Sequence, residues 1–277
     1  MKETSAKDRL YAALRKLPPK PVDVPLAQPT AANDDDEEGD DDIEESGTTG
    51  KVSQAEKKAY SEKMSAELAQ AFAAELRSRG LPNPRPANPG GDGGKSGAER
   101  RMSGGIGAKK VDVTSATEEA GLVLAISIKT INFKDARSRN YQKNLVNRRG
   151  DMLFEAVTLH RRFPYAVCAG FLFFDEEANR DGTSGKTGRK STFRNAHDAF
   201  KLFTHRIDSA GRDEQFERFY IALHTLSATN PKVQFFLAGE PEKELDLDRI
   251  FDELVELVAL REPDLYVAEG GQLRRRR

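Results

Sequence analysis

Two short segments of the sequence hold residue types that can act together on a phosphate ester. Asp112 lies within 109–115, and Ser127 and Lys129 follow after a gap of fourteen residues, within 122–133. Side chains two residues apart in a strand share one face, so Ser127 and Lys129 would project together. A carboxylate can bind a divalent cation, and a lysine beside it can orient water and offset charge that develops on phosphate. Metal-assisted hydrolysis uses these residue types.

The elements that would position these residues follow from periodicity and capping signals. A helix over 53–79 is expected from its apolar spacing and from Gly80, and a second over 138–162 is ended by Pro164. Further elements are expected as a helix over 5–17, strands over 109–115, 122–133 and 165–174, a helix over 192–206, strands over 216–223 and 232–237, and a helix over 246–260. This order predicts an α/β domain with a mixed central sheet flanked by helices.

The segment from Glu99 to Phe174 resembles the PD-(D/E)xK nuclease superfamily, which includes many restriction enzymes. The resemblance is carried by Val111-Asp112-Val113 and by Ser127-Ile128-Lys129-Thr130 within an apolar strand, and it covers under a third of the chain. It implies a restriction-endonuclease-like core in which Asp112 binds Mg²⁺ and Lys129 positions the attacking water. The implied function is a magnesium-dependent endodeoxyribonuclease of the restriction or defence type.

Ser127 departs from the superfamily pattern, which has an acidic residue at this position. Some restriction enzymes with Ser here recruit a Glu from the following helix, although nearer the motif, where this chain has Lys143. The helix over 138–162 offers Asp151 and Glu155 four residues apart, and Glu155 is favoured because it borders the apolar stripe. A defective metal site is the competing outcome. Glu99 matches an acidic residue that many members carry on their first helix.

Basic residues are concentrated after the strand that contains Lys129. Arg and Lys neutralise phosphates, and Asn can read adenine edges in the major groove. The candidate DNA contacts are Lys134, Arg137, Arg139, Asn144, Arg148, Lys186 and Arg189. The alternative is that these residues form a solvated surface, with Asp151 and Glu155 in helix-surface ion pairs with Arg148.

The net charge of −1 is a sum over unlike regions. Residues 34–45 contain ten acidic residues and no basic one, and without them 44 basic residues face 45 − 10 = 35 acidic ones, a balance of +9. We therefore expect a mostly disordered acidic and Pro-rich arm over 1–50, a nuclease-like domain over 51–266 and a flexible basic tail over 267–277. The acidic tract would shield the basic surface until DNA displaces it.

Several classes of protein are disfavoured by the sequence. Its charged N-terminus and its lack of a long apolar run predict neither a secretion signal nor a membrane span, and the single cysteine, Cys168, excludes a disulfide framework, so a cytoplasmic protein is expected. The segments 94–96 and 185–187 lack the glycine spacing of a P-loop. Two alternatives to a nuclease remain: a non-catalytic DNA-binding protein on the same scaffold, or a scaffolding protein with an acidic partner. A homodimer would supply the two sites needed to cut both strands.

Overall fold

The computed structural model describes residues 4–22, 24–25, 49–87, 100–103, 108–182, 189–227 and 229–276. The helices are α1 (Ala6–Leu14), α2 (Gln54–Ser78), α3 (Gln142–His160), α4 (Thr192–Phe200) and α5 (Leu247–Arg261), with a 3-10 turn η1 (Glu176–Asn179). The strands are β1 (Val24–Pro25), β2 (Thr49–Gly50), β3 (Arg100–Ser103), β4 (Ala108–Val111), β5 (Val113–Thr117), β6 (Gly121–Ile131), β7 (Val167–Asp175), β8 (Arg218–Thr225), β9 (Lys232–Leu237), β10 (Glu244–Leu245), β11 (Tyr266–Glu269) and β12 (Gln272–Arg275).

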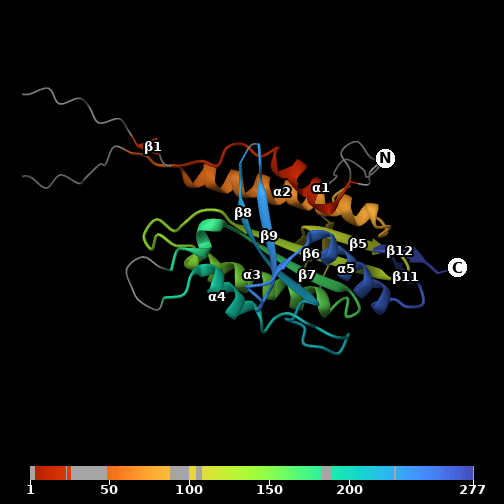
Figure 1. The fold of residues 1–277 in the computed structure, drawn as a ribbon. Helices are drawn as coiled ribbons and strands as arrows, with labels where there is room; N and C mark the ends of the chain where they lie inside the picture. Colours follow the sequence, from red (N-terminus) through yellow and green to blue (C-terminus); the bar gives the residue numbers. More distant parts are fainter. Residues whose placement is uncertain are drawn as a thin grey trace, which may run out of the picture.

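A six-stranded sheet in the order β10-β9-β8-β7-β6-β5 is the centre of the fold (Figure 1). β6, β7 and β8 are parallel, whereas β5, β9 and β10 each run antiparallel to their inner neighbour. β7 is buried on both faces along nearly its whole length, as its continuous apolar sequence predicted. The predicted mixed α/β architecture is confirmed.

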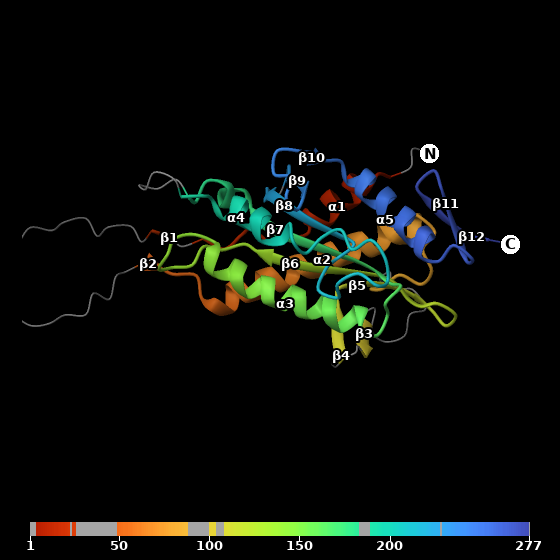
Figure 2. The ribbon, with the colours of Figure 1, turned by 90° about the horizontal axis from the view of Figure 1, so that it is seen from below.

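Helices cover both faces of this sheet and enclose two hydrophobic cores. α1, α2 and α5 pack on one face, where Phe72 of α2 meets Phe171 of β7 with ring centroids 4.9 Å apart. α3 and α4 pack on the other face, where Phe200 of α4 stacks on Phe219 of β8 at 4.0 Å (Figures 1 and 2). Because α3 connects the parallel strands β6 and β7, it lies directly over them.

The segment that was expected to be one strand over 109–115 is divided at Asp112. β4 ends at Val111 and pairs with β3 in a separate two-stranded sheet, whereas β5 begins at Val113 and pairs with β6. Asp112 therefore lies between two sheets and not within a strand. The sequence did not reveal the β3–β4 hairpin. Apolar and polar residues alternate through 110–114 as in one strand, although residues before and after Asp112 pair with different strands.

α3 and α4 are shorter than the helices predicted over 138–162 and 192–206. α3 begins at Gln142, about four residues late, because the Asp135 carboxylate accepts hydrogen bonds from the backbone N–H groups of Arg137 and Ser138 and stabilises a turn there. α4 ends at Phe200, and the chain continues through turns to β8. Among the described residues, no helix combines the length and the apolar character needed to cross a membrane.

Both terminal regions contribute to the fold. α1 lies within the region that was expected to be mostly a disordered arm, and its Leu10 is buried in the α2 core. Residues 26–48, which hold the acidic tract, lie outside the described part of the chain.

The C-terminal segment that was expected to be a flexible tail instead forms the β11–β12 hairpin. The backbone N–H of Leu273 donates to Arg79 O at 2.7 Å, and the Arg79 guanidinium contacts Glu75 and Asp252.

Candidate active site

Asp112 is held against β6 by its carboxylate at the junction of β4 and β5. Its Oδ2 accepts a hydrogen bond from the backbone N–H of Ile128 at 2.6 Å and lies 3.3 Å from Lys129 Nζ. The Asp112 carboxylate thus gives the backbone N–H of Ile128 an acceptor at the point where the chain passes from the β3–β4 hairpin to the main sheet. This places the Asp112 carboxylate beside the Ser127-Ile128-Lys129 segment.

Lys129 joins Asp112 to Glu155 of α3. Lys129 Nζ lies 3.5 Å from Glu155 Oε2, so carboxylates from two different elements approach one ammonium. The side chain of Glu155 is 0% exposed, whereas those of Lys129 and Asp112 are 19% and 15% exposed. The cluster is therefore buried on the α3 side and reaches solvent on the side of Asp112 and Lys129.

The position of Glu155 follows from the packing of α3. Met152, Glu155, Ala156 and Leu159 are all buried and have the spacing of one helical face, so a carboxylate occupies a place in the apolar stripe. Gly170 of β7 leaves room for the Phe219 ring of β8 and for Met152 of α3, since a Cβ there would lie 2.5 Å from the ring and 3.3 Å from the Met152 methyl group. Glu155, one turn of α3 from Met152, lies beside Lys129 of β6.

The electrostatics of the cluster keep Lys129 charged. Burial would lower the pKa of Lys129, but the adjacent Asp112 and Glu155 carboxylates outweigh it and raise the pKa above its usual value. A charged group with so little exposure is costly to bury, and such arrangements concentrate at functional sites. Two carboxyl groups with a single ammonium retain capacity for a further cation.

The donor set fits a magnesium ion. Mg²⁺ takes one or two protein carboxylates together with water and phosphate oxygens. Both contacts of Asp112 described above use Oδ2, which leaves Oδ1 as a candidate ligand, and Glu155 supplies the second carboxylate. Ser127 shares the face of Lys129 and is 1% exposed, but its hydroxyl is a poor magnesium ligand. Glu155 is thus the second carboxylate beside Lys129.

The structure separates the two acids that were proposed to replace the missing one. Asp151 is 51% exposed and lies 3.3 Å from Arg148 on the helix surface, so the surface ion-pair interpretation applies to it. Glu155, by contrast, lies beside Lys129. Glu99 falls outside the described residues.

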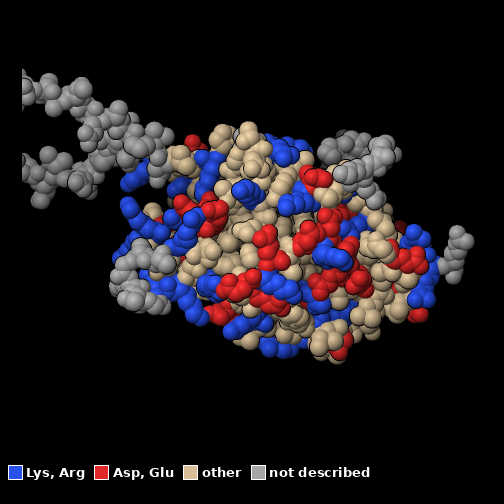
Figure 3. Space-filling model, viewed as in Figure 1, with Lys and Arg blue, Asp and Glu red and all other residues tan. Residues whose placement is uncertain are grey.

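Three of the predicted DNA contacts have partners within the protein. Lys134 pairs with Glu177 at 2.7 Å, Asn144 donates to Phe133 O at 3.5 Å, and Arg148 pairs with Asp151. Arg137, Arg139 and Arg189 are exposed, and Lys186 lies outside the described residues. Lys and Arg side chains gather at the left end of the face shown in Figure 3, where Figure 1 places the loop that follows β6.

A second cluster of ionisable groups was not predicted from the sequence. Glu217 Oε2 accepts from Cys168 N at 2.8 Å and lies 3.2 Å from His160 Nε2, while its Oε1 accepts from Arg206 at 3.1 Å and Arg261 at 2.7 Å. These four donors occupy the Glu217 carboxylate, so its hydrogen-bonding capacity is used within the cluster that it forms with His160 and Cys168. These groups come from distant parts of the chain, so no local motif marks them.

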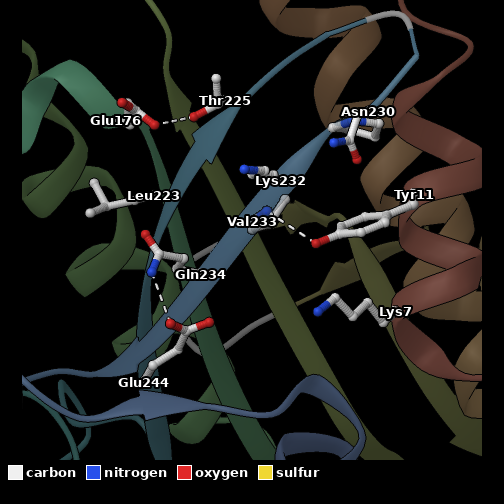
Figure 4. A pocket seen from close by; sticks show the side chains of 11 residues that line it. Lys7, Tyr11, Glu176, Leu223, Thr225, Asn230, Lys232, Val233, Gln234 and Glu244 are labelled. Atoms are coloured by element: carbon white, nitrogen blue, oxygen red, sulfur yellow. Dashed lines mark hydrogen bonds between the residues drawn. The ribbon is translucent and has the colours of Figure 1, made fainter.

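One cavity lies away from both clusters. A pocket of about 410 Å³ opens between α1 and the edge of β9 (Figure 4). Tyr11 Oη accepts from the backbone N–H of Val233 at 3.4 Å, and Glu244 accepts from Gln234 at 2.8 Å. The pocket contains neither Lys129 nor its two carboxylates.

Comparison of the chain with protein-family models, curated proteins and solved structures finds no match. The resemblance to the PD-(D/E)xK superfamily therefore rests on the order of the elements and on the residues themselves. Those residues are Asp112 between β4 and β5, Lys129 on β6 and Glu155 on α3.

Proposed function

We propose that the protein is a magnesium-dependent endodeoxyribonuclease of the restriction or defence type. The observation that carries the proposal is the approach of Asp112 and Glu155, from two separate elements, to 3.3 and 3.5 Å from Lys129 Nζ. The exposed basic residues Arg137, Arg139 and Arg189 support a polyanionic substrate.

The chemistry follows from the three side chains. Asp112 and Glu155 would hold the metal ion, which supplies Lewis-acid activation of the phosphate and of water. Lys129, kept protonated by its two neighbours, would orient the attacking water and stabilise negative charge on the phosphate. The phosphodiester would approach from the partly exposed side of Asp112 and Lys129, while Glu155 stays buried.

Cleavage of supercoiled plasmid DNA tests this function. We expect the wild-type protein to nick or linearise plasmid with Mg²⁺ and to be inactive with EDTA, and we expect Asp112→Asn, Lys129→Ala and Glu155→Gln to remove cleavage. Asp151→Asn is the matched control, because it changes an acid on the same helix that is exposed and paired with Arg148. Cleavage that persists in Glu155→Gln or disappears in Asp151→Asn would contradict the site.

A second candidate function is non-catalytic DNA binding on the same scaffold. It is favoured by Lys129 itself, because an ammonium between two carboxylates stabilises the cluster without a metal ion. Titration with Mn²⁺ separates the two functions: Mn²⁺ binding that is lost in Glu155→Gln supports the nuclease. DNA binding without metal binding or cleavage supports the alternative.

A further inference from the structure

The outer edge of β9 is only partly covered by a neighbouring strand. β10 pairs with two residues of β9, Phe235 and Phe236. In the described part of the chain, Lys232, Val233 and Gln234 therefore have a strand partner only on the β8 side. The pocket of about 410 Å³ opens along this uncovered stretch (Figure 4). An uncovered strand edge presents backbone N–H and C=O groups to which an extended peptide can add.

The backbone of Val233 is turned toward this pocket. Its N–H donates to Tyr11 Oη of α1 and is therefore directed away from β8. The C=O of the same residue points to the same side, because a residue of an antiparallel pair exchanges both of its hydrogen bonds with one neighbour. The bond to Tyr11 is 3.4 Å long, against a usual length of ~2.9–3.0 Å. A peptide C=O at the usual distance would hold this N–H more strongly than Tyr11 does.

The pocket also holds two ammonium groups that are available to a ligand. Within the described ranges of the chain, neither Lys7 nor Lys232 forms an ion pair, and both side chains are exposed. The acids of the pocket, Glu176 and Glu244, each accept a hydrogen bond from a neighbouring side chain (Figure 4). A carboxylate on the ligand would therefore find a cation whose charge is not yet paired.

The two faces of the β9 edge favour different side chains. Residues that are directly paired across two strands share a face. A peptide residue opposite Val233 would lie on the face of the α1 core, beside Leu10 and Leu247, which line an adjoining pocket of about 280 Å³. The next residue, opposite Lys232, would lie on the other face beside the ammonium. The edge thus fits an apolar residue followed by an acidic one.

We infer that the β9 edge binds an extended acidic peptide of a partner protein, which adds antiparallel to residues 232–234 in line with β10. The peptide residue opposite Val233 accepts from its N–H in place of Tyr11 Oη and donates to its C=O. Glu244 disfavours an acid opposite Gln234, so the matching order from the N-terminus is polar, apolar, acidic. This inference is independent of the proposed nuclease function, because the pocket contains neither Lys129 nor its two carboxylates.

An NMR titration of the isotope-labelled protein with the peptide Thr-Val-Glu, blocked at both ends, tests strand addition. We expect saturable shifts of the amide signal of Val233 and of its neighbours in β9. Tyr11→Phe removes the competing acceptor and should tighten binding about twofold, as expected for one weak hydrogen bond. The same peptide with an N-methylated valine cannot donate to the Val233 C=O and should not bind.

A charge reversal tests the contact with Lys232. Lys232→Glu changes an exposed side chain and should weaken binding of Thr-Val-Glu about fivefold at low salt, while it strengthens binding of Thr-Val-Lys. Lys243→Glu is the matched control, because this exposed lysine precedes β10 and pairs with Glu240. It should bind Thr-Val-Glu as the wild type does.

Four results would overturn the inference. No saturable shift at millimolar peptide, or equal binding of the N-methylated peptide, would mean that no strand is added. Equal binding of Thr-Val-Glu and Thr-Val-Lys by the wild type would mean that Lys232 only protects an exposed edge from pairing. If the Val233 signal shifts with protein concentration in the absence of peptide, the occupant of the edge is a second copy of this chain.

Discussion

The Lys129 cluster and the Glu217 network are both buried groups of charge, but they are balanced in opposite ways. In the first, Asp112 and Glu155 share one ammonium, and Asp112 and Lys129 keep some exposure to solvent. In the second, one carboxylate is held by two guanidinium groups, an imidazole and a backbone N–H, and its side-chain partners are at most 6% exposed. The Glu217 carboxylate, with all its acceptor positions occupied by donors, stabilises the fold. The two carboxylates of the Lys129 cluster share one ammonium and can therefore bind a further cation.

The largest effect that separates the two clusters should come from Glu217→Gln. This change leaves the buried Arg206 and Arg261 without their carboxylate, and breaking a buried ion pair costs about 3–5 kcal/mol. The free energy of unfolding, measured by urea denaturation, should fall by this amount. A loss below about 1 kcal/mol would mean that the network is not structural.

Glu155→Gln should change stability little and activity strongly. Lys129 retains Asp112 as a partner, and an amide still accepts from the ammonium, so the free energy of unfolding should change by only about 1 kcal/mol. Plasmid cleavage should fall by at least about 100-fold, because a charge-stabilising group of the site is lost. A stability loss as large as that of Glu217→Gln would remove the distinction between the clusters.

Magnesium should stabilise the protein through one cluster only. At a free concentration ten times its Kd, a ligand that binds only the folded state adds ~1.4 kcal/mol. The thermal midpoint should rise with Mg²⁺ in wild type and in Asp151→Asn, but not in Asp112→Asn or Glu155→Gln. An unchanged response in Glu155→Gln would exclude Glu155 as a ligand.

The pH dependence of stability should give the most local signal, because it depends on the surroundings of single histidines. Burial would lower the pKa of His160, but the neighbouring Cys168 and Glu217 raise it to about 10. The stabilisation is then fully present below the usual histidine pKa of ~6.5 and is lost as pH rises toward 10. Wild type should therefore lose more stability than His160→Gln between pH 7 and 10, as measured by urea denaturation at each pH.

His197 should give the opposite pH dependence of stability. Burial lowers its pKa to about 4, and its Nδ1 accepts a hydrogen bond from Gly239 N at 3.1 Å. Its contribution to stability should be lost as pH falls from ~6.5 to 4. If His160→Gln altered the acid limb instead of the alkaline one, the assignment of the two histidines would be wrong.

The sequence predicted most of the central elements because periodicity and capping are local properties. Ser53 caps α2 with a capping box, and the apolar run that was assigned to a buried strand is β7. Glu155 could be favoured over Asp151 because its place beside the apolar stripe is visible in the helical spacing. These predictions needed no knowledge of the partners across the fold.

Features that depend on tertiary pairing were missed. The break at Asp112 arises because β4 and β5 pair with different strands, and a sequence that alternates through the break does not reveal the change. The partners of Glu217 come from the end of α3, the start of β7, the loop before β8 and the end of α5. Residues so far apart in the sequence become neighbours only once the sheet has formed.

The hydrogen bond from Leu273 to Arg79 has a consequence for the synthesis of the chain. The end of α2 is closed by residues that are translated almost two hundred positions later, and its guanidinium partner Asp252 is nearly as distant. During translation, the C-terminal end of α2 therefore lacks these two partners until nearly all of the chain has left the ribosome. We expect nascent chains stalled before α5 to recruit chaperones, and those released after β12 to fold without them.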